Sequence, residues 1–223
     1  MRLVYALSVS ETLRSMFREL WVKDLDHPFV VELYSGTLPL EKFKYYVLQD
    51  YNYLVTMVRV LSLLAAKAPT LELSRLALEL AYGTATGEME NYERLLSALG
   101  MTIDDAIKAK PNPTNVAYMN FLLLTAYHGD FYAGLASVLP CFWTYEDIAE
   151  RHRWRLEANR VELYKRWASV YLSNEYKALV RKLRDAVDKS GRVAGELSYY
   201  FEQALKYEIM FWQSAYTMEE WPF

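Results

Sequence analysis

Apolar residues recur at intervals of three and four along almost the whole chain, which is the period of an α-helix buried on one face. No stretch shows the strict alternation, bounded by turn residues, that predicts a β-strand, so the pattern predicts an all-α fold. Pro and Gly divide the chain into roughly eight segments without a long linker or a repeat of fixed period. The interruptions are His27 and Pro28, Gly36 and Pro39, Pro69, Gly100, Pro111 and Pro113, Gly129, and Gly191.

Two acidic residues fall inside the apolar faces of these predicted helices. Asp50 lies within the apolar series of residues 43–57, and Glu208 lies at the centre of the corresponding series over residues 201–215. An isolated charged carboxylate is costly to bury, so each must be paired, hydrogen-bonded, protonated or open to a cavity. Either one could be a structural group bonded to Tyr, Arg or a helix end. Two acids that face one interior are also the usual components of an active site.

The only cysteine of the chain, Cys141, lies in the stretch SVLPCFWTYED. The pattern predicts one helix from Asp130, its capping residue, to about Trp154, and Pro140 should kink it beside the thiol. A free cysteine often behaves as a small buried hydrophobe, which is one interpretation of Cys141. As a nucleophile it would need a distant base, the substrate or backbone dipoles to form its thiolate, because no residue within four positions is cationic.

Composition narrows the function classes. The chain has 223 residues, 53% of them hydrophobic, and a net charge of −3 with no basic tract of five or more residues. We therefore expect a single domain over residues 1–223 that does not bind nucleic acid. A single cysteine forms no internal disulfide, which fits a cytoplasmic protein. No apolar run approaches the roughly 18 residues of a membrane span, so no membrane association is expected.

The sequence lacks the residue patterns that typically bind metal ions or nucleotide phosphates. The three histidines are far apart, and neither Glu-x-x-His nor His-Glu-x-x-His occurs, so no metal site is predicted. No P-loop and no Gly-x-Gly-x-x-Gly motif is present. His27 beside Pro28 could serve as a haem ligand or as a helix cap. No cofactor is expected.

Three blocks of the sequence resemble signature blocks of a known family. The stretches HPFVVELYSGTLPLEKFKYYVLQDYNYL, SVLPCFWTYED and KYEIMFWQSAY are similar in order and spacing to those of the TenA family, also known as thiaminase II or aminopyrimidine aminohydrolase. The resemblance implies an all-helical, haem-oxygenase-like fold without haem, assembled as a homotetramer. It also implies hydrolysis of 4-amino-5-aminomethyl-2-methylpyrimidine to the hydroxymethylpyrimidine used in thiamin synthesis, with release of ammonia, and an ability to cleave thiamin.

The same resemblance implies roles for individual residues. Cys141 matches the nucleophile that adds to the pyrimidine ring, Glu208 the acid that contacts the ring nitrogen, and Asp50 the carboxylate that reads the amino-pyrimidine edge. The matched substrate-binding tyrosines are Tyr53, Tyr118, Tyr145 and Tyr171. Two other classes remain open: a non-catalytic pyrimidine-binding or regulatory protein on the same bundle, which would release no ammonia, and a haem or redox protein, which would show a Soret band.

Overall fold

A computed structural model describes residues 7–223, and these residues form helices and connecting turns without a β-strand. The all-α prediction is confirmed. The α-helices are α1 (Val9–Met16), α2 (Arg18–Leu25), α3 (Pro28–Ser35), α4 (Leu40–Lys67), α5 (Leu71–Gly83), α6 (Met89–Ala98), α7 (Ile103–Lys108), α8 (Pro113–His128), α9 (Phe131–Arg151), α10 (Arg153–Ala158), α11 (Glu162–Ser169), α12 (Asn174–Asp188) and α13 (Ala194–Thr217). A π-helical segment, η1 (Thr84–Glu88), joins α5 to α6, and a short 3₁₀ turn, η2 (Val170–Leu172), follows α11.

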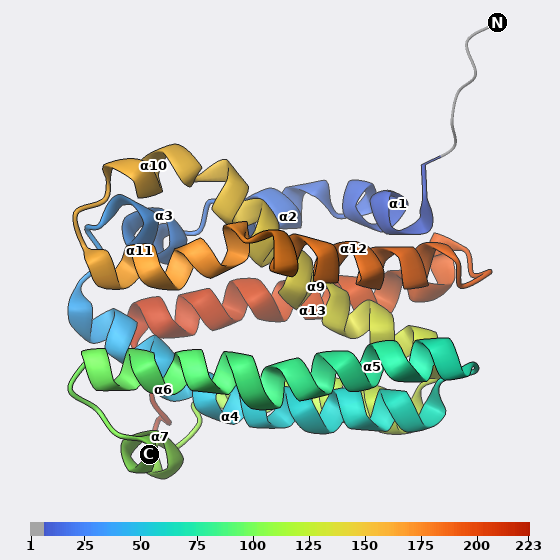
Figure 1. The fold of residues 1–223 in the computed structure, drawn as a ribbon, viewed down its shortest axis with the longest axis horizontal. Helices are drawn as coiled ribbons and strands as arrows, with labels where there is room; N and C mark the ends of the chain where they lie inside the picture. Colours follow the sequence, from blue (N-terminus) through green and yellow to red (C-terminus); the bar gives the residue numbers. More distant parts are fainter. Residues whose placement is uncertain (1–6) are drawn as a thin grey trace, which may run out of the picture.

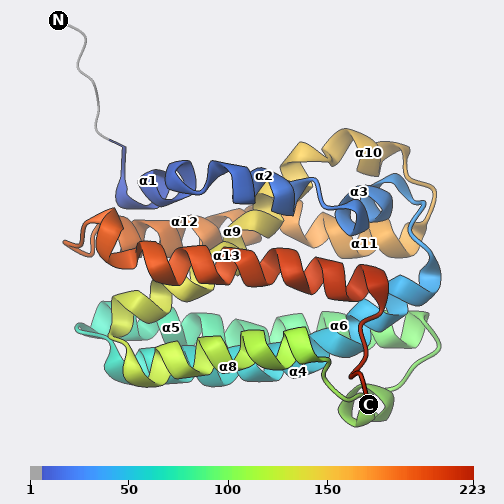
Figure 2. The ribbon, with the colours of Figure 1, turned by 180° about the vertical axis from the view of Figure 1, so that it is seen from behind.

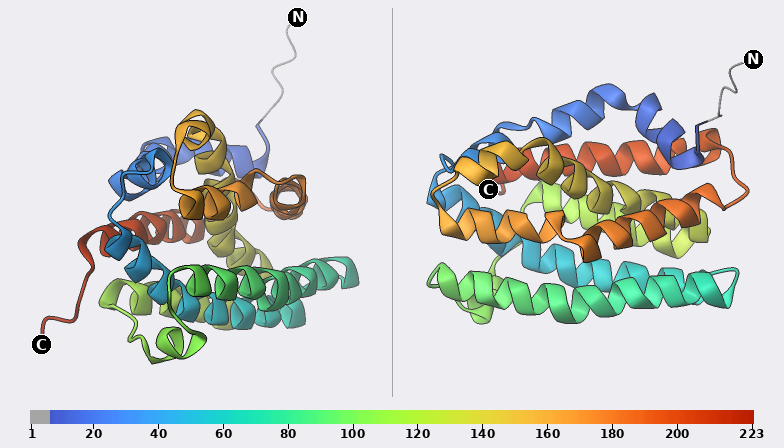
Figure 3. Two further views of the ribbon diagram at one scale, coloured as in Figure 1. Left: turned by 60° about the vertical axis from the view of Figure 1, so that its left-hand side comes forward. Right: turned by 45° about the horizontal axis from the view of Figure 1, so that its top comes forward.

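Helices α9 and α13 form the centre of the bundle (Figure 1). Helix α13 packs against α9, and both contact α8 and α4 on one side and α2 on the other. Helix α5 runs along the outer side of α4, as the reverse view also shows (Figure 2). Helices α1, α2, α3, α10, α11 and α12 lie on the opposite side (Figure 3). Asp50, Cys141 and Glu208 lie on α4, α9 and α13, so the central packing brings the three elements of the expected site together.

The centre of the bundle is closely packed. Most residues of α9 are buried, including Trp143, whose ring lies edge-on to Trp21 at a centroid distance of 4.9 Å. Gly134 allows α9 to approach α4, because a Cβ atom at this position would lie 2.2 Å from Leu64 Cδ2. A larger residue at position 134 would push the two helices apart.

Every break that Pro and Gly predict within the described residues separates two elements. Gly100 follows α6 with a φ of +70°, and the Asp130 carboxylate accepts a hydrogen bond from the Ala133 N–H at 2.8 Å as the cap of α9. The prediction of roughly eight segments is too low for the described part of the chain, which holds thirteen α-helices. Breaks without Pro or Gly, such as the one at Phe17, have no strong sequence signal.

The predicted helix around Cys141 is correct at its start but too long at its end. Helix α9 continues through Pro140 and ends at Arg151, not near Trp154. The buried His152 follows it, and its Nε2–H donates to the Leu25 carbonyl at 2.8 Å, which holds the chain out of the helical path. His27 caps α3 through Nδ1, which accepts from the Phe29 N–H, and its Nε2 bonds to Gln213. With both ring nitrogens engaged, His27 is not free to bind haem.

Candidate active site

A small chamber lies beside Cys141, between α4, α9, η2 and the first turn of α12. Its volume is about 30 Å³, enough for about two water molecules. The lining side chains are Tyr46, Asp50, Tyr53, Leu54, Met57, Glu88, Cys141, Phe142, Tyr145, Tyr171 and Tyr176. Five of the seven residues predicted from the sequence are in this set, and the other two, Tyr118 and Glu208, lie directly behind it.

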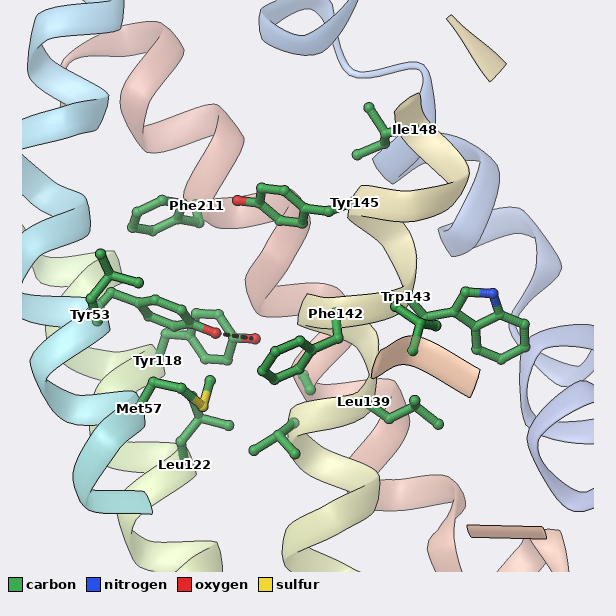
Figure 4. Close-up of a cluster of buried hydrophobic side chains, with 14 of the residues drawn as sticks. Tyr53, Met57, Tyr118, Leu122, Leu139, Phe142, Trp143, Tyr145, Ile148 and Phe211 are labelled. Carbon is green, nitrogen blue, oxygen red and sulfur yellow. Dashed lines mark hydrogen bonds between the residues drawn. The ribbon is translucent and has the colours of Figure 1, made fainter. Parts of the chain in front are cut away.

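Helix periodicity places the lining residues. On α4, Tyr46, Asp50, Tyr53 and Met57 follow one another at intervals of three and four and so share one face. On α9, Cys141 and Tyr145 are one turn apart for the same reason. Figure 4 shows Tyr53 and Met57 from α4 facing Phe142 and Tyr145 from α9, with the hydroxyls of Tyr53 and Tyr118 meeting between them.

A hydrogen-bonded series of two phenols leads to the acid behind the thiol. The Tyr53 hydroxyl donates to the Tyr118 hydroxyl at 3.4 Å, and the Tyr118 hydroxyl donates to Glu208 Oε1. Cys141 lies beside both Tyr53 and Glu208. The two phenols and the carboxyl group are therefore coupled, next to the thiol, in an interior where hydrogen bonds are electrostatically strong.

Glu208 is 2% exposed, and its environment favours the neutral acid. Burial raises the pKa of Glu208 to about 8, and repulsion by Asp24 on α2 contributes in the same direction. The Tyr118 hydroxyl, which donates to Glu208, and the nearby Cys141 thiol lower this pKa, but they do not offset burial. Glu208 is therefore mostly protonated at neutral pH and can donate a proton to a bound base.

Cys141 rests as a thiol. Burial raises its pKa well above the ordinary value, and Glu208 raises it further wherever that acid is ionised, whereas the nearby Tyr53 hydroxyl lowers it. No Lys, Arg or His lines the chamber. The chamber wall thus offers no local cation to stabilise a thiolate, as the sequence around Cys141 predicts.

Asp50 lies where the chamber opens. Burial is the main reason that its pKa is raised well above the ordinary value, and the nearby carboxyl groups of Glu88 and Glu208 add to the effect. Asp50 also lines a second, larger cavity of about 430 Å³ between α5, α6, α11 and α12. The two cavities share six lining residues, namely Asp50, Leu54, Glu88, Phe142, Tyr171 and Tyr176, so they meet at this junction.

Three polar residues of the chamber wall are absent from the set predicted from the sequence: Tyr46, Glu88 and Tyr176. Tyr46 precedes Asp50 by one turn, so the face of α4 that holds Asp50 could have identified it. Glu88 falls four residues after the buried Thr84 and four before the buried Tyr92, so it is a third acid within an apolar helix face. Tyr176, which donates to the Phe142 carbonyl at 3.0 Å, had no such signal.

Between residues 7 and 223, no three His, Cys, Asp or Glu side chains gather in a way that could hold a metal ion. No helix in this part of the chain is both long and apolar enough to cross a membrane.

Fold and site together define a class of all-helical proteins in which a partly buried thiol and acidic residues surround a small chamber. A structure from Shewanella denitrificans OS217, described as a domain of unknown function with a heme oxygenase-like fold, superposes with a TM-score of 0.75 at 11% identity over 94% of this chain and 91% of that one. The likeness confirms the predicted haem-oxygenase-like fold. Residues 14–218 match the model of the TENA/THI-4/PQQC family, so the chain belongs to that family.

Two relatives with closer sequences match over nearly the full chain. The aminopyrimidine aminohydrolase of Bacillus subtilis (strain 168) is 30% identical over 221 residues, which cover 96% of this chain and 92% of that protein. The structure of a TenA homologue protein from P. horikoshii OT3 has a TM-score of 0.91 and 46% identity, covering 95% of this chain and 99% of that one. The predicted resemblance to TenA proteins is confirmed.

Proposed function

We propose that this protein is an aminopyrimidine hydrolase of thiamin salvage. It converts 4-amino-5-aminomethyl-2-methylpyrimidine and water to the 5-hydroxymethyl compound and ammonia. The observation that carries the proposal is the contact of the Cys141 thiol with Glu208 at the end of a chamber that Asp50 and aromatic rings line. The name of the Bacillus subtilis relative supports the same reaction.

Covalent addition of Cys141 to the ring is the first step of the proposed mechanism. The sulfur forms a bond with a ring carbon beside a ring nitrogen, Glu208 gives its proton to that nitrogen, and the thiol proton passes to Glu208. Protons and charge balance in this exchange. It also answers how a resting thiol without a neighbouring cation becomes a nucleophile, because the protonated ring accepts the electron pair.

Loss of the amine follows. The electron pair of the adduct expels ammonia from the protonated aminomethyl group and leaves an exocyclic methylene. Water adds to this methylene, and the proton that it loses passes to the released ammonia. Reversal of the first step then breaks the C–S bond, returns the proton to sulfur and gives the alcohol. Asp50 holds the amino-pyrimidine edge, while Tyr53, Tyr118, Tyr145 and Tyr171 position the ring between them.

The test is ammonia release by the purified protein. Wild type should turn over the aminomethylpyrimidine, whereas Cys141→Ala and Glu208→Gln should not, and Glu202→Gln on the same helix, away from the chamber, should behave as wild type. Mass spectrometry of quenched wild-type reactions should show a pyrimidine adduct that Cys141→Ala lacks. Retained activity in Cys141→Ala would contradict the covalent step. Binding of the pyrimidine by folded wild type without ammonia would favour the non-catalytic binder.

Three further assignments belong to this proposal. Thiamin is a second substrate, tested by the same assay with release of its thiazole. The protein acts in the cytoplasm, where a single reduced thiol is stable. It assembles as a homotetramer, which sedimentation measurements on the purified protein would test.

A further inference from the structure

Glu88 occupies an unusual place in the bundle. It ends the π-helical segment η1, which joins α5 to α6, and π-helical turns within α-helices are frequent at functional sites. The inward face of this long helical rod is otherwise buried, with Leu80 and Thr84 before Glu88 and Tyr92 and Leu96 after it. Glu88 itself is exposed, because at this position the face borders the junction where the chamber beside Cys141 meets the larger cavity.

The size of the chamber requires a ligand to pass this junction. A substituted pyrimidine is much larger than two water molecules, so a ring that touches Cys141 cannot lie within the inner chamber alone. Part of it must extend toward the cavity of about 430 Å³. Glu88 lines both spaces and therefore lies beside any ligand that reaches the thiol from that cavity.

The charge at the junction is unbalanced. Asp50 and Glu88 both line it, and the charge of Glu88 is the largest electrostatic contribution to the raised pKa of Asp50. No Lys, Arg or His of residues 7–223 forms an ion pair with Glu88 within 4.0 Å. On the wall of the larger cavity, Glu79 is paired with Lys182, and Arg94 with Glu90, and this wall also holds Arg166 and Glu175. None of the six residues that line both cavities is a Lys, Arg or His. The junction is thus suited to a cation supplied by a ligand.

The surroundings of the Glu88 carboxyl group shift its titration. The packed wall raises the pKa of Glu88 to about 7, and the Thr84 side chain beside it opposes this shift. A bound cation favours the carboxylate, so Glu88 is charged when an ammonium group lies beside it.

We propose that Glu88 recognises the positively charged aminomethyl group of the substrate, and so determines the preference for the amine over the neutral alcohol product. This inference rests on the proposed function. An alkylammonium donates charge-assisted hydrogen bonds to a carboxylate, whereas the alcohol donates only a neutral one. The same contact therefore favours substrate binding and allows the product to leave.

The test compares the two ligands in Glu88→Gln, which keeps the shape of the side chain and removes its charge. The KM for the aminomethylpyrimidine should rise about tenfold or more, because a hydrogen bond to a charged group is lost. The inhibition constant of the hydroxymethylpyrimidine should stay within about twofold, and this neutral ligand also reports that the chamber is folded. Glu88→Asp, which keeps the charge, should give a smaller rise in KM.

The control is Glu93→Gln, an exposed acid of α6 that lines neither cavity and should leave both constants unchanged. Equal increases for amine and alcohol, or none for either, would overturn the inference while wild-type turnover upheld the proposed function. If wild type releases no ammonia, calorimetric titration of wild type and Glu88→Gln with both ligands decides the inference separately. Selective loss of amine binding would support it, and equal binding by both proteins would refute it.

Discussion

The two ends of the cavity system each present a glutamate, in opposite surroundings. At the inner end, Glu208 on α13 is 2% exposed, accepts a hydrogen bond from Tyr118 and lies beside Cys141. At the outer end, Glu88 is exposed on the cavity wall. The surroundings of each carboxyl group, and not the residue type, therefore suit Glu208 to proton transfer and Glu88 to the recognition of charge.

The largest expected effect comes from removing the thiol at the inner end. Cys141→Ser keeps the side-chain shape but substitutes a much weaker nucleophile, so kcat should fall by about 10³-fold or more. Steady-state ammonia release measures it. The KM for the amine should change little in Cys141→Ser, whereas it should rise in Glu88→Gln. An unchanged kcat in Cys141→Ser would show that Cys141 is not the nucleophile.

The next effect is on the pH dependence of the rate. If Glu208 acts as an acid, kcat should fall as the pH rises through about 8, where the buried carboxyl group loses its proton. Glu208→Gln should lower kcat by about 10²-fold or more and remove this alkaline limb. Rate profiles from pH 6 to 10 for wild type, Glu208→Gln and Glu88→Gln make the comparison. If the alkaline fall in rate shifted to another pH in Glu88→Gln, the assignment of proton transfer to Glu208 and charge recognition to Glu88 would be contradicted.

Stability should depend on pH for the same reason. The folded state holds a proton on Glu208 up to about pH 8, whereas the unfolded chain releases it near 4.5. The stability of wild type relative to Glu208→Gln is therefore greatest below pH 4.5 and is lost between there and about pH 8, by at most about 1.4 kcal/mol per pH unit. Urea unfolding of both proteins measures this difference. Parallel stability curves would show that Glu208 is not protonated in the folded state.

The smallest expected effect comes from one hydrogen bond. Tyr118→Phe removes the donor that lowers the pKa of Glu208, so the alkaline limb of the rate should move to higher pH. The loss of one positioning bond should cost about 1 kcal/mol of transition-state stabilisation, or about fivefold in kcat/KM. Tyr199→Phe, on an exposed side chain of α13, is the matched control. If the alkaline fall in rate occurred at the same pH in Tyr118→Phe as in wild type, Tyr118 would not affect the pKa of Glu208.

Periodicity and turn residues predicted the fold class and the main helix boundaries, because Pro and Gly act locally on the backbone. The breaks at Phe17 and His152 could not be predicted in this way. The break at His152 depends on a bond to the Leu25 carbonyl, more than a hundred residues away in sequence. The apolar face of α4 likewise identified Asp50, whereas the face that holds Glu88 includes the polar Thr84 and is harder to recognise as an apolar series.

The order of residues along the chain is enough to predict that the protein is helical, that Asp50 and Glu208 point inward, and that Cys141 lies in a block similar to that of the TenA family. The packing of the helices places these residues around one chamber, bonds Tyr118 to Glu208 and sets Glu88 between two cavities. Side-chain direction follows from local periodicity, whereas cavities and pKa shifts arise where helices far apart in the sequence pack together.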